Sequence, residues 1–231
     1  MKLSKNDIEL LKNVAGITEQ AKFKKGKQQR FGNSSIVTQI ELENDFPVDF
    51  AICDRLTNFL SMVTLVENAE LEFKSSEEDE DIRFVTIKNS NAKNRIRFFG
   101  SPTELIQDIP QINFKNSDNI QEIELSKSVI DNIITVAKTI GSENIVFINK
   151  DKTLMLKACT VEDENYKHFF EVEVGDCDLQ DFQIVLDKNK MKFLSSSYIL
   201  KTDFTSKFVK FESSDYKVEY TIAVNDEYTK F

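Results

Sequence analysis

Lysine side chains recur at matched places in the two halves of this chain. Leu3-Ser4-Lys5 opens the segment LSKNDIELLKNVAGI, and Leu125-Ser126-Lys127 opens the similar segment LSKSVIDNIITVAKTI. Further lysines follow at Lys12 in the first segment and at Lys138 in the second. Ammonium groups that are fixed at intervals on one surface can bind phosphates without reading a base sequence. The chemistry that this pattern indicates is binding to a polyanion.

Both segments are predicted to be amphipathic helices. Ser4 and Ser126 are suitable N-caps, and the apolar residues that follow recur at helical spacing with the lysines on the opposite face. For any single lysine, an ordinary solvated face with pairing to Glu9 or Asp131 is an alternative. The apolar stripes consist of Ile8, Leu11 and Ala15 in the first segment and of Ile130, Ile133, Ile134 and Ala137 in the second.

Each half also contains a shorter segment that is predicted to be helical. These segments are DRLTNFLSMV, which begins at Asp54, and DKNKMKFLSS, which begins at Asp187. An aspartate at the start of a helix can accept hydrogen bonds from the first backbone N–H groups. The first segment carries Arg55, and the second carries Lys188 and Lys192.

Strand patterns surround these helices. Apolar and polar residues alternate in YKVEYTIAV, from Tyr216 to Val224, and in RIRFF, from Arg95 to Phe99. This period of two indicates strands with one buried face. Each half reads as β-α-β-β-β followed by a second copy, so the sequence predicts an α+β fold of two similar domains, each a duplicated β-α-β-β-β unit.

The predicted domains comprise residues 1–110 and 121–231, with an interdomain connector at residues 111–120. The stretch SPTELIQDIPQINFKNSDN, from Ser101 to Asn119, holds two of the three prolines and several polar turn-forming residues. Such a composition is typical of a connector.

The charge is distributed unevenly along the chain. The net charge is −9, from 39 acidic and 30 basic residues, and this balance alone argues against a nucleic-acid partner. The acidic residues, however, gather outside the predicted helices, as in EEDED at 77–81 and EDE at 162–164. If the helices lined a ring and the sheets formed its outside, the hole would be positive and the rim negative. Duplex DNA would then pass through the hole by phosphate contacts that permit sliding.

The chain resembles the sliding DNA clamps of T-even-type tailed phages. The resemblance rests on MKLSK, LLKN and Ala15 near the start, and on Tyr220, Ala223-Val224 and a polar tail that closes on Phe231. Length, acidic balance and the internal duplication agree with it. It implies a homotrimeric ring with sheets outside and helices inside, which encircles double-stranded DNA and has no catalytic activity and no cofactor.

The same resemblance implies partners and a location. A clamp of this kind tethers the replicative DNA polymerase, is opened by an ATP-driven clamp loader, and in T-even-type phages also activates late transcription with host RNA polymerase. It acts in the cytoplasm of the infected bacterial host.

The resemblance also assigns candidate residues to three surfaces. At the subunit interface, Arg95–Phe99 would pair with about Tyr166–Val174 of a neighbour, because an unpaired edge strand would otherwise invite aggregation. The DNA-facing candidates are Lys5, Lys12, Arg55, Lys127, Lys138, Lys188 and Lys192. The interface candidates are Arg95, Ile96, Phe98 and Phe169, and those for a partner-peptide pocket are Ile109, Ile112, Phe114 and Val224. The alternatives are that the interface strands are ordinary sheet interior and that the connector only packs on its own domains.

Enzymatic and metal chemistry find little support in the sequence. His168 is the only histidine and lies in the aromatic stretch YKHFF without a nucleophile pattern. The three cysteines do not have metal-ligand spacing, and the acidic run SSEEDEDI lacks the ordered ligands and glycine of a calcium loop. No secretory signal or membrane-spanning stretch is predicted.

The alternative function is that of a binding protein of another class, namely a monomeric β-rich phage structural protein or a single-strand-binding protein. A platform for single strands needs exposed aromatic residues among basic ones, whereas most phenylalanines here occupy alternating core positions. A structural protein would have no need for lysines that are collected on helices.

Overall fold

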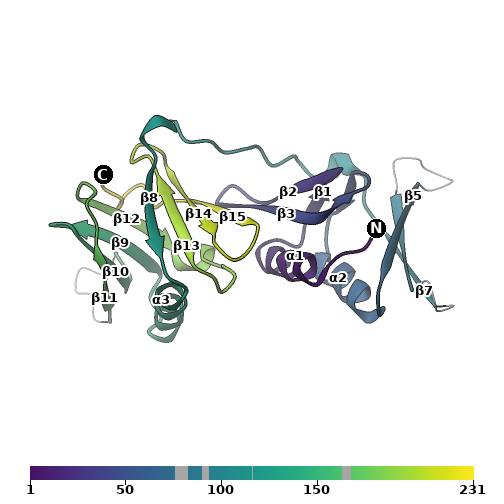
Figure 1. Cartoon of the computed structure of the whole chain (residues 1–231), viewed down its shortest axis with the longest axis horizontal. Helices are drawn as coiled ribbons and strands as arrows, with labels where there is room; N and C mark the ends of the chain where they lie inside the picture. Colours follow the sequence, from purple (N-terminus) through teal and green to yellow (C-terminus); the bar gives the residue numbers. More distant parts are fainter. Residues whose placement is uncertain (76–82, 90–93, 116, 163–167) are drawn as a thin grey trace. The chain divides into compact units, whose positions relative to one another are not determined.

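The computed structural model describes all residues except 76–82, 90–93, 116 and 163–167. The acidic run at 77–81 and the start of the predicted edge strand at Tyr166 therefore lie outside the described residues. Contacts divide the chain into two units (Figure 1). The units are Met1–Asn33 with Val37–Pro110, and Ser34–Ile36 with Gln111–Phe231.

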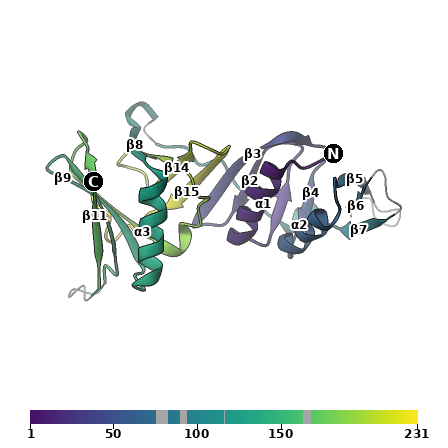
Figure 2. The ribbon, with the colours of Figure 1, turned by 60° about the horizontal axis from the view of Figure 1, so that its bottom comes forward.

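The first unit combines helices with antiparallel strands. Its elements are α1 (Lys5–Ile17), β1 (Ala21–Phe23), β2 (Gly26–Gly32), β3 (Ile36–Phe46), β4 (Phe50–Ile52), α2 (Leu56–Leu65), β5 (Glu70–Ser75), β6 (Arg83–Lys88), β7 (Arg95–Phe99) and a 3-10 turn (Thr103–Leu105). β1 pairs with β4, β2 pairs with β3, and β6 lies between β5 and β7. α1 and α2 lie side by side (Figures 1 and 2).

Phenylalanine rings hold α2 onto the strands of the first unit. Phe23 and Phe46 stack with their ring centroids 4.5 Å apart, and Phe50 contacts Phe73 edge-on at 5.3 Å. Phe59 of α2 reaches this cluster, with its centroid 6.2 Å from that of Phe50. Burial of these large rings contributes to packing the helix against the strands.

A buried carboxylate fixes the start of α1. Ser4 and Asp7 form a capping box, in which the Ser4 side chain accepts from the Asp7 N–H and the Asp7 side chain accepts from the Ser4 N–H, each at 3.0 Å. The second Asp7 oxygen accepts from the N–H of Glu43 in β3 at 2.9 Å. Ser126 caps α3 (Lys127–Thr139) by accepting from the Val129 N–H. Both predicted serine caps are confirmed.

The second unit carries α3 against a four-stranded antiparallel sheet. Its other elements are β8 (Gln121–Leu125), β9 (Asn144–Lys150), β10 (Thr153–Cys159), β11 (Phe170–Asp176), β12 (Phe182–Asp187), β13 (Tyr198–Thr202), β14 (Phe208–Ser213), β15 (Val218–Ala223) and 3-10 turns at Ser117–Asn119 and Lys188–Lys190. The order β11-β10-β9-β12 forms the sheet on which α3 packs, and β15, β14, β13 and β8 pair successively in that order. Near the end of the chain, Lys230 pairs with Gln183 at the outer edge of β12.

The predicted cap of α2 is wrong. Asp54 does not cap the helix, and the N-cap residue is Arg55, whose backbone is left-handed with a φ of 71°. Glu19 satisfies the first donors instead: its carbonyl accepts from the Leu56 N–H at 3.2 Å and its carboxylate accepts from the Thr57 N–H at 3.1 Å. A residue that follows α1 thus performs the capping that the local sequence assigned to Asp54.

The predicted fourth helix is also wrong. DKNKMKFLSS forms only the three-residue 3-10 turn Lys188–Lys190, which Asp187 caps by accepting from the Asn189 N–H at 2.8 Å. The residues that follow turn away because buried tyrosines bind the backbone of Leu194, as described below. Lys188 and Lys192 therefore stand on an irregular segment rather than on one helical face.

We predict opposite effects for alanine at two glycines of the first unit. A Cβ at Gly100 would lie 2.5 Å from a Phe50 ring carbon and 2.9 Å from the Ala51 carbonyl oxygen, whereas a Cβ at Gly16 in α1 meets nothing within 4 Å. Gly100→Ala should lower the free energy of unfolding by about 1–3 kcal/mol, because the core has no room for it. Gly16→Ala should raise it by up to about 1 kcal/mol through helix propensity. Urea unfolding followed by far-UV circular dichroism measures both changes, and equal effects of the two substitutions would contradict this packing.

Candidate nucleic-acid interface

The predicted basic residues of the first unit are exposed. Lys5 and Lys12 lie on α1, and Arg55 lies at the start of the neighbouring α2. Arg55 forms an exposed ion pair with Asp54, with 3.0 Å between its Nε and the carboxylate. Exposed pairs of this kind are weak and are screened by salt, so the guanidinium can exchange Asp54 for a phosphate at little cost.

A surface cavity of about 470 Å³ lies between α1 and α2. Another, of about 510 Å³, lies in the second unit. Lys12, Gly16, Glu19, Thr57 and Ser61 are among the residues that line the cavity between α1 and α2. The Thr57 hydroxyl donates to Glu19 at 2.6 Å, and this bond, with that of the Thr57 N–H, lowers the pKa of the Glu19 carboxyl. Glu19 is therefore ionised but already engaged, which leaves the Lys12 ammonium as the cationic group of this cavity.

In the second unit, the predicted lysines of α3 are exposed at both ends of the helix. Lys127 is the first residue of α3, and Lys138 lies in its last turn. A cation in the last turn interacts favourably with the helix dipole, which helps to retain a lysine there. Apolar residues hold the opposite face, since Ile130, Ile133 and Ala137 are fully buried. The amphipathic reading of this segment is confirmed.

The residues that follow Lys192 are fixed next to the start of α3. The Ser195 hydroxyl donates to Asp131 at 2.5 Å, and the Ser197 hydroxyl accepts from the Lys127 N–H at 3.1 Å. Lys192 is exposed and Lys188 is half-buried. The fold therefore brings Ser195–Ser197 beside Lys127, whereas the Lys188 N–H donates at 2.9 Å to the carbonyl of Glu143, which follows the other end of α3.

Two buried phenols hold this segment in place. Tyr198 donates to the Leu194 carbonyl at 2.6 Å, and the Tyr220 oxygen accepts from the Leu194 N–H at 3.3 Å. Burial raises the pKa of Tyr220 to about 12 and also raises that of Tyr198. The sequence analysis missed this role, and the available signal was the pair of tyrosines at inward positions of β13 and β15.

The predicted subunit-interface residues lie on an edge strand or directly before one. Among the described strands, β7 pairs only with β6 and β11 pairs only with β10. On β7, Arg95 is exposed and Ile96 is half-buried, whereas Phe98 points inward and its ring centroid is 5.3 Å from that of Phe59. Phe169 precedes β11 and is 56% exposed, with the Lys157 ammonium 4.6 Å from its ring centroid. Both strands present unpaired backbone groups along one edge.

The predicted partner-pocket residues fall into both units. Ile109 is half-buried at the end of the first unit. In the second unit Ile112 is half-buried, Val224 is buried, and Phe114 stacks on Phe208 with 5.1 Å between ring centroids. Phe114 thus attaches its part of the chain to β14.

The described residues contain no group of His, Cys, Asp and Glu side chains that could hold a metal ion. His168 is exposed, and Cys53, Cys159 and Cys177 are free thiols. Burial raises the pKa of the Cys159 thiol, which makes it a weak nucleophile. Within the described part of the chain, no helix is long and apolar enough to cross a membrane.

Comparison with known proteins gives two similar curated sequences, although the chain matches no protein-family model. The chain is 28% identical over 204 residues to the sliding clamp of Vibrio phage KVP40. This alignment covers 86% of this chain and 88% of that protein. It is 26% identical over 239 residues to the sliding clamp of Escherichia phage RB69, which covers 99% of both. The resemblance to the sliding clamps of T-even-type phages is confirmed.

Solved structures of clamps have the same fold. The PCNA2–PCNA3 complex from Sulfolobus tokodaii aligns with a TM-score of 0.62 at 14% identity, over 97% of this chain and 99% of that chain. The DNA polymerase III β subunit from Pseudomonas aeruginosa aligns with a TM-score of 0.65 at 10% identity, over 98% of this chain and 64% of that chain. The chain therefore has the DNA-clamp fold, and the predicted fold class is confirmed.

The tyrosine anchors of the candidate interface predict an alkaline transition. The raised pKa of Tyr220 means that the folded state favours the neutral phenol, so its stabilising contribution is complete below pH about 10 and is lost as the pH rises through about 12. In a titration of tyrosinate absorbance, Tyr220→Phe should remove amplitude near pH 12. An unchanged titration in a variant with native circular dichroism would contradict the assignment.

Proposed function

We propose that this chain is a sliding clamp, a protein without catalytic activity that closes into a ring around duplex DNA and tethers a replicative DNA polymerase. The observation that carries this proposal is the similarity to two phage sliding clamps, together with the clamp fold. The alignment with the RB69 clamp covers 99% of both chains. The exposed lysines of α1 and α3 supply the sequence-independent contacts to phosphate that such a ring needs.

The ring is proposed to be a homotrimer that closes through β7 of one subunit and β11 of the next. Each strand has one unpaired edge in the described chain, and strand addition between such edges satisfies the backbone donors and acceptors of both. Arg95, Ile96, Phe98 and Phe169 are the proposed interface residues. A head-to-tail contact that closes after a fixed number of subunits yields a ring rather than a filament.

Partner proteins are proposed to bind by short peptides next to Ile109, Ile112, Phe114 and Val224. Two clamps with this fold support the peptide mode, because they were solved with the C-terminal region of FEN-1 and with a DNA ligase peptide. A clamp loader, and late transcription factors with host RNA polymerase, complete the proposed set of partners on the strength of the resemblance. The proposed location is the cytoplasm of an infected bacterium.

The subunit arrangement predicts the mass of the assembly. Light scattering should give about three times the 26.6 kDa of one chain, with monomer appearing on dilution. Phe169→Asp should shift the population to monomer, because it places a charge at the proposed contact. Phe231→Asp is the matched control, since Phe231 is also an exposed phenylalanine but lies outside that contact. A wild-type chain that stays monomeric at every concentration would favour the β-rich structural or single-strand-binding alternative.

The DNA-facing surface predicts an effect of charge reversal that depends on position. Lys5→Glu, Lys12→Glu, Lys127→Glu and Lys138→Glu together should abolish the gain in product length on primed DNA with polymerase and loader. A control reverses Lys25, Lys27, Lys150 and Lys217, which are also exposed but lie outside the helices, and should keep the gain. Both variants change the net charge equally, so the difference isolates the helical surface. Equal losses in the two variants would contradict the inward-facing assignment.

A further inference from the structure

In the described chain, β7 and β11 each have one free edge, whereas the opposite edge of each of their sheets is covered. In the sheet β5-β6-β7, the Met1 carbonyl accepts from the Leu71 N–H of β5 at 2.8 Å, and the Met1 ammonium donates to the Leu71 carbonyl at 2.7 Å. In the sheet β11-β10-β9-β12, Lys230 exchanges two such bonds with Gln183 of β12, at 2.7 and 2.8 Å. β7 and β11 are therefore the edges of these two sheets that can take another strand.

The exposed side chains of β7 are two cations followed by an aromatic ring. Arg95, Arg97 and Phe99 are exposed and alternate with half-buried apolar residues. The Arg97 guanidinium lies 4.5 Å from the ring centroid of Phe84 on β6, and that centroid lies 5.7 Å from the centroid of Phe99. The order along this edge is cation, cation, ring.

The exposed side chains at β11 have the complementary order. Phe169, Glu171 and Glu173 are exposed and also alternate with half-buried apolar residues. The Lys157 ammonium of β10 lies 4.6 Å from the ring centroid of Phe169 and 3.9 Å from the Glu171 carboxylate. The order along this edge is ring, anion, anion, which is the reverse of that on β7 with the charges inverted.

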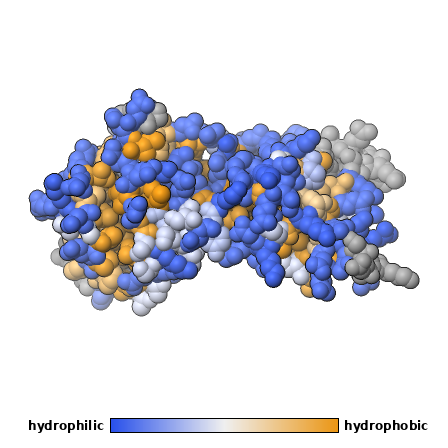
Figure 3. Space-filling view, viewed as in Figure 1, coloured by the Kyte–Doolittle hydropathy of each residue, from blue (hydrophilic) through white to orange (hydrophobic). Residues whose placement is uncertain are grey.

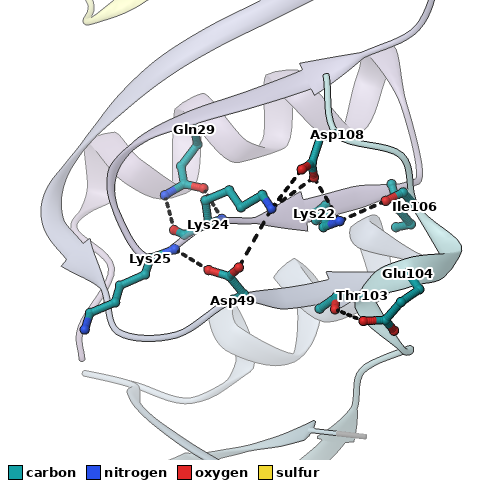
Figure 4. A network of polar contacts seen from close by, with 9 residues as sticks. All are labelled: Lys22, Lys24, Lys25, Gln29, Asp49, Thr103, Glu104, Ile106 and Asp108. Carbon is teal, nitrogen blue, oxygen red and sulfur yellow. Dashed lines mark hydrogen bonds and ion pairs between the residues drawn. The ribbon is translucent and has the colours of Figure 1, made fainter. Parts of the chain in front are cut away.

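The two arginines of β7 have no carboxylate partner in the part of the chain that the structure describes. Lys22 and Lys24 differ in this respect, because their ammonium groups lie 2.8 and 3.0 Å from Oδ1 of Asp108 in the same unit (Figure 4). Arg95 and Arg97 are thus available to carboxylates of another chain.

The aromatic ends of the two edges are open to solvent. Apolar side chains reach the surface among hydrophilic ones in both units (Figure 3). Phe99 is 58% exposed and Phe169 is 56% exposed, so both are among the exposed large apolar side chains of the described chain. Contact between two such rings would remove apolar area from water and form an aromatic pair.

One antiparallel register places unlike charges, rings and apolar residues opposite each other at every position. A shift by two residues leaves one arginine opposite a phenylalanine or a glycine, and a shift by one turns the apolar face outward. The opposed pairs in the matching register are Arg95 and Glu173, Ile96 and Val172, Arg97 and Glu171, Phe98 and Phe170, and Phe99 and Phe169.

A parallel arrangement fits less well. It can also place both arginines against the glutamates, but it then brings Phe99 to Gly175 and separates it from Phe169. The register of β11 with β10 shifts between Glu173 and Gly175, so the strand is irregular where the parallel ladder would continue.

Each strand also pairs poorly with its own copy. Two β7 strands would bring arginines together, two β11 strands would bring glutamates together, and like charges on paired strands are destabilising. The charges therefore favour a contact between unlike edges, which is the head-to-tail kind that closes a ring.

We propose that β7 of one chain pairs antiparallel with β11 of a second copy in the register given above, and that the two arginine–glutamate pairs select this register and exclude pairing of like edges. This inference rests on the ring of the proposed function and adds to it the direction of the strands, their register and the residues that set both.

Disulfide cross-linking tests the register in a chain with Cys53→Ser and Cys177→Ser. Arg97→Cys with Glu171→Cys places two thiols opposite each other, where Cα atoms are about 4.5–5.5 Å apart and a disulfide can form. Arg95→Cys with Glu171→Cys is the matched control, because it removes the same residue types but offsets the Cα atoms to beyond about 7 Å. Mild oxidation should link subunits in the first variant only, as seen on a non-reducing gel.

The other outcomes separate the register from the ring. Cross-links in the control variant alone would overturn the register, because that pair is opposed in the parallel arrangement or in a shifted one. A multimer by light scattering without cross-links in either variant would overturn the register and leave the ring standing. A monomer at every concentration would overturn the ring, and this inference with it.

Charge exchange tests the role of the ion pairs. Arg97→Glu places like charges opposite each other and should raise the concentration at which the assembly dissociates by about tenfold. Arg97→Glu with Glu171→Arg restores an unlike pair and should recover most of this loss, which a merely structural role of Arg97 would not do. Lys27→Glu is the control, since it makes the same change of charge at an exposed site on β2. A double variant as weak as Arg97→Glu would overturn the selection by charge.

Discussion

Burial of one apolar face of each helix against strands is the interaction on which the rest of this structure depends. Phe59 fixes α2 to the phenylalanine cluster of the first unit, and Ile130, Ile133 and Ala137 fix α3 to the sheet of the second. Because a helix that buries one face must expose the other, these contacts also decide which side chains reach solvent. The lysines of α1 and α3 are exposed as a direct consequence of apolar packing elsewhere on the same helices.

Hydrogen bonds then fix the helix ends and the irregular segment that the local sequence does not position. Asp7 fixes α1 to β3, and Glu19 supplies to α2 the cap that Asp54 does not. Tyr198 and Tyr220 bind both backbone groups of Leu194 and so direct the segment that carries Lys192. In each case a buried or engaged polar group is acceptable because its partner is present. Most of these partners lie far away in the sequence, as Glu43 does from Asp7, Thr57 from Glu19 and Leu194 from Tyr220.

The proposed binding to DNA depends on the separation of basic from acidic residues. An acidic chain binds a polyanion only if its cations face the ligand and its anions face away, since screening limits each charge to its own neighbourhood. The exposed lysines of α1 and α3 are the cations that are proposed to face the ligand. Ionic contacts such as that between Lys24 and Asp108 instead serve the chain itself, because they hold an irregular stretch that has no apolar face to bury.

The sequence by itself determined the elements with strong periodicity: α1 and α3 with their serine caps, and strands such as β7 and β15 with their alternating residues. These follow from short-range rules, because a cap or an alternation involves only residues a few positions apart. Only the tertiary structure decided that DKNKMKFLSS forms a 3-10 turn and that Glu19 rather than Asp54 caps α2. It also decided that Asp108 binds Lys22 of β1 and Lys24, which directly follows that strand. Each of these depends on groups far apart in the sequence that folding brings within hydrogen-bonding distance, and no local pattern encodes such a meeting.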